Sequence, residues 1–64
     1  MVGKNIKKLR KDYEWTQEDL AAKLDVSPGA ISNYERAKRE PDIAMLIKMA
    51  DTFKISIDEL VGRV

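Results

Sequence analysis

Three polar residues in the segment 28–36 carry side chains that can hydrogen-bond to nucleic-acid bases. The amide of Asn33 can bind adenine through two hydrogen bonds, Arg36 can reach guanine or a phosphate, and Ser32 can contact either. Successive residues of a helix rotate by about 100°, which places Gly29 on the same side. Three residues lie on the opposite side: Ile31, Tyr34 and Glu35. One side therefore suits packing and the other can contact DNA, although the same polar residues also suit a face that meets only solvent.

The chain lacks the side chains on which most acid–base and metal chemistry depends. Its 64 residues include no histidine and no cysteine, which removes the usual general base and the commonest metal ligands. A small enzyme built from carboxylates, lysines, tyrosines and hydroxyls is the alternative, but no pair of carboxylates marks a cleft. We therefore predict that the protein is not an enzyme and requires no metal or cofactor.

Basic residues cluster at two places, although the net charge is only +1. Residues 4–11 contain no acid and the following basic residues: Lys4, Lys7, Lys8, Arg10 and Lys11. A second cluster consists of Arg36, Lys38 and Arg39, whereas residues 12–25 are mostly acidic. This distribution predicts a polarised surface that can anchor a DNA backbone, and the alternative is a set of ordinary solvated helix faces.

The length of the chain limits its organisation. A chain of 64 residues forms one domain, residues 1–64, and leaves no room for a second core. No apolar run approaches the roughly 20 residues that span a bilayer, and the N-terminus lacks the apolar stretch of a signal peptide. We expect a cytoplasmic protein with no membrane partner.

Helical patterns recur along the chain, and no stretch alternates apolar and polar residues as a strand would. The fold is therefore predicted to be all-α, compact and built from five helices. Their predicted ranges are 3–13, 17–24, 28–36, a fourth that opens at Pro41 and Asp42, and 57–61. The fourth has the clearest apolar stripe: Ile43, Leu46, Ile47, Ala50 and Phe53.

Local signals mark where three of these helices begin. Thr16 and Ser56 are N-caps with an acidic residue three positions later, and Ser27 is an N-cap followed by Pro28. An apolar residue before each cap pairs with one inside the helix. The pairs are Trp15 with Leu20, Val26 with Ile31, and Ile55 with Leu60. Trp15 is therefore expected in or near the core, and the alternative is that its ring stacks on a base.

The second and third predicted helices are joined by the short turn Asp25-Val26-Ser27, which is the layout of a helix-turn-helix. The unit runs from Gln17 to Arg36. In such units the second helix enters the DNA major groove. The side of segment 28–36 that bears Asn33 is thus the predicted reading surface.

Three motifs are spread along nearly the whole chain: Thr16-Gln17-Glu18-Asp19-Leu20-Ala21, Val26-Ser27 followed by Ala30-Ile31-Ser32-Asn33-Tyr34-Glu35-Arg36, and Ile55-Ser56-Ile57-Asp58-Glu59-Leu60. Together they resemble the Xre/Cro family of lambda-repressor-like regulators. The resemblance implies a prokaryotic or phage-encoded repressor that acts at the nucleoid and binds a double-stranded DNA operator as a homodimer. It also implies that Gln17 holds a DNA phosphate, aided by the backbone amides of its helix N-terminus. The predicted DNA-binding set is Thr16, Gln17, Ser27, Pro28, Gly29, Ser32, Asn33, Arg36, Lys38 and Arg39.

The sequence departs from the family pattern at two kinds of position. Pro28 and Gly29 stand where relatives often carry long polar side chains, so readout should depend more on Asn33, on bridging water and on DNA shape. Where the family often has glycine after a helix, this chain has Glu14, Asp25, Ala37 and Lys54. If the backbone is left-handed there, Ala37 is the most strained of the four.

Arg10 and Glu35 place charges on the apolar faces of their predicted helices, four residues after Ile6 and Ile31 respectively. A buried charge needs a partner. We therefore predict that the two form a structural ion pair, as the resemblance also implies. The alternative is that both side chains extend outward to solvent.

Two further expectations concern protein partners. Leu60, Val61 and Val64 are candidates for a dimer seam, or they cap the core of the monomer. A helical domain of this kind can also bind a partner protein instead of DNA, as an antitoxin does. Steep loss of affinity with salt would identify the DNA binder.

Overall fold

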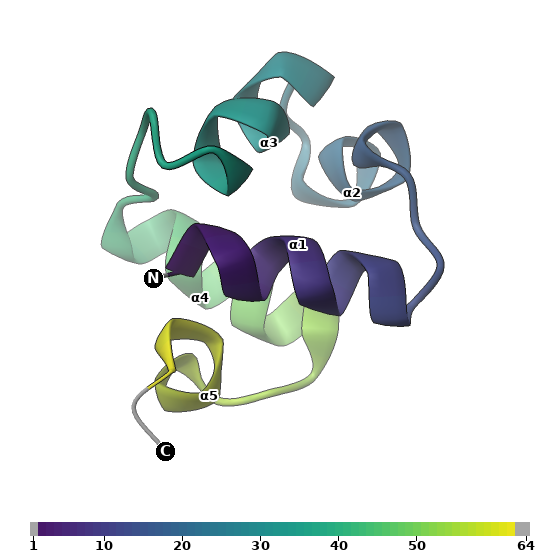
Figure 1. The fold of residues 1–64 in the computed structure, drawn as a ribbon. Helices are drawn as coiled ribbons and strands as arrows, with labels where there is room; N and C mark the ends of the chain where they lie inside the picture. Colours follow the sequence, from purple (N-terminus) through teal and green to yellow (C-terminus); the bar gives the residue numbers. More distant parts are fainter. Residues whose placement is uncertain (1, 63–64) are drawn as a thin grey trace.

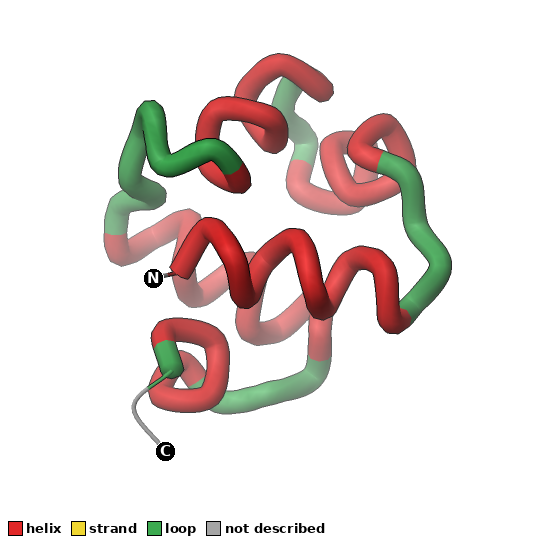
Figure 2. Tube along the Cα trace, viewed as in Figure 1, coloured by secondary structure: helices red, strands yellow, loops and turns green. Residues whose placement is uncertain are grey.

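The chain folds into five helices in the computed structural model, which describes residues 2–62. They are α1 (Val2–Asp12), α2 (Gln17–Leu24), α3 (Pro28–Glu35), α4 (Ile43–Phe53) and α5 (Ile57–Val61). In Figure 1, α1 crosses in front of α4, with α2 and α3 above this pair and α5 below it. Loops join the helices, and residues 2–62 contain no strand (Figure 2), so the all-α prediction is confirmed. None of the described helices has the length and apolar character that crossing a membrane requires.

Side-chain caps define where four of the helices begin. The Thr16 hydroxyl accepts a hydrogen bond from the Asp19 N–H, and the Asp19 carboxylate accepts one from the Thr16 N–H. Ser56 and Glu59 form the same reciprocal pair at α5. The other two caps are Ser27 for α3 and Asp42 for α4. The predicted starts of α2, α3 and α5 are confirmed, because each depends on local chemistry.

Three predicted boundaries are wrong by one residue. α1 spans Val2–Asp12 rather than 3–13, and Tyr13 lies in the turn that follows. The Tyr13 hydroxyl donates a hydrogen bond to the Phe53 carbonyl oxygen (2.7 Å), which holds this turn against α4. α3 ends at Glu35, and Arg36 is its C-cap. Differences of one residue are ordinary where helix ends fray.

Every helix contributes apolar side chains to one core. The buried residues are Ile6, Leu20, Ala21, Leu24, Ile31, Tyr34, Met49, Ala50, Phe53 and Leu60. Trp15, Val26 and Ile55, the predicted partners before three caps, pack against this core. The helices therefore share one continuous apolar centre that fixes how α2 and α3 are held.

The apolar stripe of α4 is wider than its buried face. Two residues of the predicted stripe lie outside the core, because Ile43 is 74% exposed and Ile47 is 46% exposed. Ala50 and Phe53 of the same stripe are buried, together with Met49. Successive residues rotate by about 100°, which turns the two isoleucines to one side of the face that the neighbouring helices cover.

The backbone is left-handed at the four positions where the family often has glycine. Glu14, Asp25, Ala37 and Lys54 all have φ of 59°. Asp25 and Lys54 are the C-caps of α2 and α4. Ala37 has no polar side chain that could bond locally, so this conformation costs it about 1–2 kcal/mol. The tight turns after the helices are thus made without glycine except at Gly62, which ends α5.

Gly3 allows α1 to touch the last turn of α3. A Cβ atom at Gly3 would lie 2.5 Å from the Tyr34 carbonyl oxygen and 3.0 Å from the Glu35 carbonyl oxygen. Backbone atoms cannot rotate away as a side chain can. The α1–α3 contact therefore requires glycine at this position.

Replacing Gly3 with alanine is expected to lower the free energy of unfolding by about 1–3 kcal/mol, because the helices must move apart. Gly29→Ala is the matched control. Its Cβ would meet only the Ser27 Oγ at 3.9 Å, in ordinary contact. It is expected to be neutral or to stabilise by up to about 1 kcal/mol. Urea titrations measure both, and equal effects would show that the close approach does not matter.

Candidate nucleic-acid interface

The turn Asp25–Ser27 joins α2 to α3 and leaves one side of α3 bare. Ile31 and Tyr34 are buried against the core. On the other side, Gly29, Asn33 and Arg36 are exposed and Ser32 is half-buried. The predicted division of this helix into a packing side and a free side is confirmed.

The exposed side of α3 offers few side chains for hydrogen bonding. Pro28 and Gly29 are exposed at its start and have no polar side chain. Within residues 2–62, the side chains of Ser32, Asn33 and Arg36 make no hydrogen bond with another residue. These three side chains are free to bind a ligand.

Arg10 and Glu35 form the predicted ion pair. Arg10 Nε donates to Glu35 Oε2 at 2.6 Å, and Nη2 donates to Oε1 at 3.2 Å. The remaining Nη1 donates to the Trp15 carbonyl oxygen at 2.8 Å. The Arg10 side chain is 10% exposed and that of Glu35 is 3% exposed. The pair therefore fastens α1 to α3 and to the segment that leads into α2.

Gln17, the first residue of α2, makes a contact that the sequence did not predict. Its Nε2 donates a hydrogen bond to Glu35 Oε1 at 3.2 Å. The residue expected to hold a DNA phosphate is thus attached to the buried ion pair. The contact depends on how α2 packs against the end of α3 in space. The spacing of residues along the chain does not show this packing, so the sequence carried no signal for the contact.

Most remaining basic side chains lie at the surface. Lys4, Lys7, Lys8 and Lys11 are exposed and follow one face of α1 at helical spacing. With Asn5 and Glu35 they line a hollow. Lys38 and Arg39 are exposed in the loop after α3. Within residues 2–62 the Arg10–Glu35 pair is the only salt bridge, so these cations have no carboxylate at ion-pair distance.

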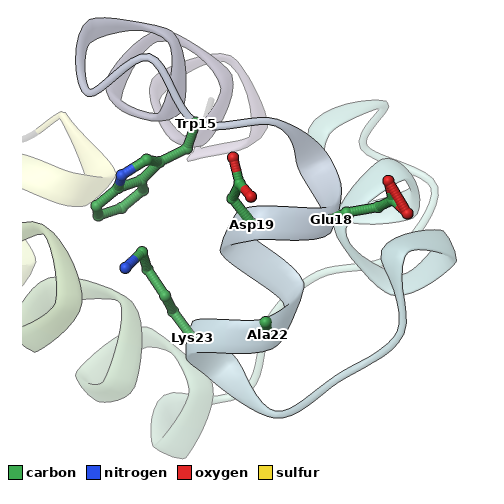
Figure 3. A pocket seen from close by; sticks show the side chains of 5 residues that line it. All are labelled: Trp15, Glu18, Asp19, Ala22 and Lys23. Carbon is green, nitrogen blue, oxygen red and sulfur yellow. The ribbon is translucent and has the colours of Figure 1, made fainter.

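A second hollow lies beside α2, and its chemistry does not suit a phosphate. It is lined by Trp15, Glu18, Asp19, Ala22 and Lys23 (Figure 3). The pKa of Asp19 lies below its ordinary value, mainly because the Thr16 backbone N–H donates a hydrogen bond to the carboxylate. The lining has two carboxylates, Glu18 and Asp19, and one ammonium, Lys23, so the hollow suits an anion poorly.

The Trp15 ring contacts two other aromatic rings and one cation. The ring stacks on Tyr13 with centroids 4.5 Å apart and lies 5.7 Å from Phe53. The Lys23 ammonium lies 4.6 Å from the ring centroid, as its direction in Figure 3 also shows. The expectation that Trp15 lies near the core is confirmed.

The three residues of the candidate dimer seam do not form one exposed surface among the described residues. Leu60 is fully buried in the monomer core, so it cannot form a seam. Val61 is half-buried beside a hollow that Val2, Pro41 and Leu46 help to line. Val64 lies outside the described residues.

Comparison with known proteins agrees with this geometry. A family model described as helix-turn-helix, HTH_3, matches residues 6–60. The chain belongs to this helix-turn-helix family. The predicted resemblance to Xre/Cro, lambda-repressor-like regulators is confirmed.

Individual relatives cover nearly all of the helix-turn-helix chain. It is 37% identical over 62 residues to the HTH-type transcriptional regulator ImmR of Bacillus subtilis, covering 97% of this chain and 49% of ImmR. It is 32% identical over 62 residues to the antitoxin PezA of Streptococcus pneumoniae, covering 97% of this chain and 39% of PezA. The P22 c2 repressor, solved in complex with synthetic operator 9T, superposes with a TM-score of 0.91 at 30% identity, covering 100% of this chain and 97% of that one. The chain spans about half the length of ImmR, and less of PezA.

Arg10→Met is expected to lower the free energy of unfolding by about 3–5 kcal/mol, because it leaves the Glu35 carboxylate buried without its partner. The double variant Arg10→Met/Glu35→Leu removes both charges and is expected to recover most of the loss. Thermal melting followed by circular dichroism measures both. Melting of Arg10→Met at the wild-type temperature would show that the pair contributes nothing.

Proposed function

We propose that residues 1–64 act as one non-enzymatic domain that binds a specific double-stranded DNA operator and represses transcription. α3 enters the major groove. The observation that carries this proposal is the free side of α3, where Ser32, Asn33 and Arg36 have no partner within the described residues, opposite a fully packed side. Similarity to the P22 c2 repressor, solved on its synthetic operator, supports it.

Backbone contacts and base contacts fall on different parts of this surface. Thr16, Gln17 and Ser27 lie at helix N-termini, where free N–H groups and the helix dipole favour phosphate. The exposed Lys38 and Arg39 add charge in the loop after α3. Base reading is left to Ser32, Asn33 and Arg36. Pro28 and Gly29 let the backbone approach the bases closely, where water and DNA shape contribute to specificity.

We also infer where the domain acts. Its relatives include regulators of bacteria and of phage, which supports a role at the nucleoid in the cytoplasm of a prokaryotic or phage-infected cell. The absence of histidine and cysteine supports a role without catalysis.

The exposed isoleucines support a homodimer. Ile43 and Ile47 on α4 and Ile57 on α5 are all exposed, and α4 packs against α5. A two-fold dimer through this region would present two copies of α3 about one helical turn of DNA, roughly 34 Å, apart. A partner protein on the same isoleucines is the second candidate, and similarity to the antitoxin PezA favours it.

Selection of bound duplexes from a random DNA pool tests the operator proposal. The wild-type chain is expected to enrich a motif. Asn33→Ala is expected to lose about 1–3 kcal/mol of discrimination at one base pair of each half-site. Failure of the wild type to enrich any motif would overturn specific binding, and an unchanged motif with Asn33→Ala would show that Asn33 does not read a base.

Salt dependence tests the backbone contacts. Affinity for the enriched duplex should fall as salt rises, and Lys38→Ala should reduce the log–log slope by about 0.9 if Lys38 neutralises one phosphate. Lys54→Asn is the matched control, since it removes one positive charge outside the predicted DNA-binding set and asparagine tolerates a left-handed backbone. Its slope should equal that of the wild type. A slope near zero for the wild type would favour the protein partner instead.

Sedimentation on the enriched duplex tests the dimer. The wild type is expected to bind as two copies, whereas Ile43→Lys should bind as one, because a charge would be buried in the interface. Ala22→Lys adds the same charge at an exposed position of α2 and should leave the stoichiometry unchanged. One copy of wild type on the full operator would contradict the homodimer.

A further inference from the structure

The hydrogen bond between Gln17 and Glu35 connects two features with different roles. Gln17 begins α2, at the position expected to hold a DNA phosphate, and is only half-buried. Glu35 ends α3 and its side chain is 3% exposed. The Nε2–Oε1 distance is 3.2 Å. One end of this contact therefore lies in the interior and the other at the candidate interface.

The chemistry of the two groups decides which end of the Gln17 amide faces Glu35. An ionised carboxylate only accepts hydrogen bonds, so the amide NH₂ must point toward it and the amide oxygen away. The NH₂ group has two N–H bonds, and Glu35 uses one of them. The second remains available to a phosphate oxygen, which also only accepts.

Without the carboxylate, nothing in the described contacts of Gln17 would select this orientation. The terminal torsion of glutamine has a broad, roughly two-fold preference. Rotation by 180° would present the amide oxygen to a phosphate, and two acceptors repel each other. In the free protein, Glu35 therefore already holds the Gln17 amide in the orientation that can donate to a phosphate.

The Glu35 carboxylate that accepts from Gln17 is itself held by hydrogen bonds. Arg10 holds both carboxylate oxygens of Glu35, at 2.6 Å and 3.2 Å, and is fixed in turn by the Trp15 carbonyl oxygen at 2.8 Å. Trp15 precedes the Thr16 cap of α2. The network therefore locates the start of α2 at both its backbone and its first side chain.

We propose that Glu35, held by Arg10, is a positioning residue that orients the Gln17 amide for a DNA phosphate. The ion pair then contributes to DNA affinity as well as to stability. This inference rests on the proposed function. It adds that the phosphate contact of Gln17 depends on the interior of the domain.

A double-mutant cycle tests the proposal on a mixed-sequence 20-base-pair duplex at low salt, with fluorescence anisotropy as the readout. Gln17→Ala is expected to weaken binding of the wild type by about 10-fold, the loss of one hydrogen bond to a charged group. In the Arg10→Met/Glu35→Leu background, confirmed as folded by circular dichroism, the same substitution should cost less than about 2-fold. Equal losses in the two backgrounds would overturn the proposal.

Asn5→Ala is the matched control for loss of an amide. Asn5 Nδ2 donates to the Leu60 carbonyl oxygen at 3.0 Å, at the contact between α1 and α5. Duplex affinity should not change with this variant. A loss equal to that of Gln17→Ala would show that the readout reports stability, which would overturn the proposal.

A measurement on the wild type needs no folded double variant. The two side-chain Nε2 proton resonances of Gln17 should respond differently to the duplex, with one moving and the one bonded to Glu35 staying in place. Movement of both, or of neither while the duplex binds, would overturn the proposal. Failure of the wild type to bind any duplex would instead remove the proposed function on which this inference rests.

Discussion

The buried ion pair between Arg10 and Glu35 is the constraint on which the arrangement of helices depends. Removing two charges from water is costly, so each hydrogen-bonding atom of the pair needs a partner. Two bonds within the pair, one to Trp15 and one from Gln17 supply those partners. Arg10 comes from α1, Glu35 from α3, and Trp15 and Gln17 from the segment that starts α2. The hydrogen bonds that satisfy the two charges therefore also connect α1 to both helices of the helix-turn-helix.

The packing that holds α3 also decides which of its side chains are left at the candidate nucleic-acid interface. Ile31 and Tyr34 bury one side of α3, and the close contact at Gly3 braces its last turn. The free side is poor in hydrogen-bonding groups at Pro28 and Gly29, whereas N-terminal amides and exposed cations surround it. Under the proposed function, such a surface would hold a DNA backbone through many groups and read bases through few side chains together with DNA shape.

The sequence predicted what depends on local chemistry and missed what depends on neighbours in space. Caps at Thr16, Ser27 and Ser56 gave the starts of three helices because their hydrogen bonds lie within one turn. Periodicity and family resemblance together gave the Arg10–Glu35 pair. Periodicity could not tell which part of the α4 stripe other helices would cover, so it did not show that Ile43 and Ile47 are exposed. The contacts of Gly3 and Gln17 depend on distances between helices, which no spacing along the chain contains.

Chemical-shift mapping tests the central claim most directly. The backbone amides of the ¹⁵N-labelled chain would be followed while the enriched operator duplex is added. We expect the changes to concentrate at the N-terminus of α2, on the free side of α3 and in the loop that carries Lys38 and Arg39, while the exposed isoleucines of α4 respond only through dimer formation. Changes that centre on α4 and α5 and leave α3 unaffected would contradict the claim.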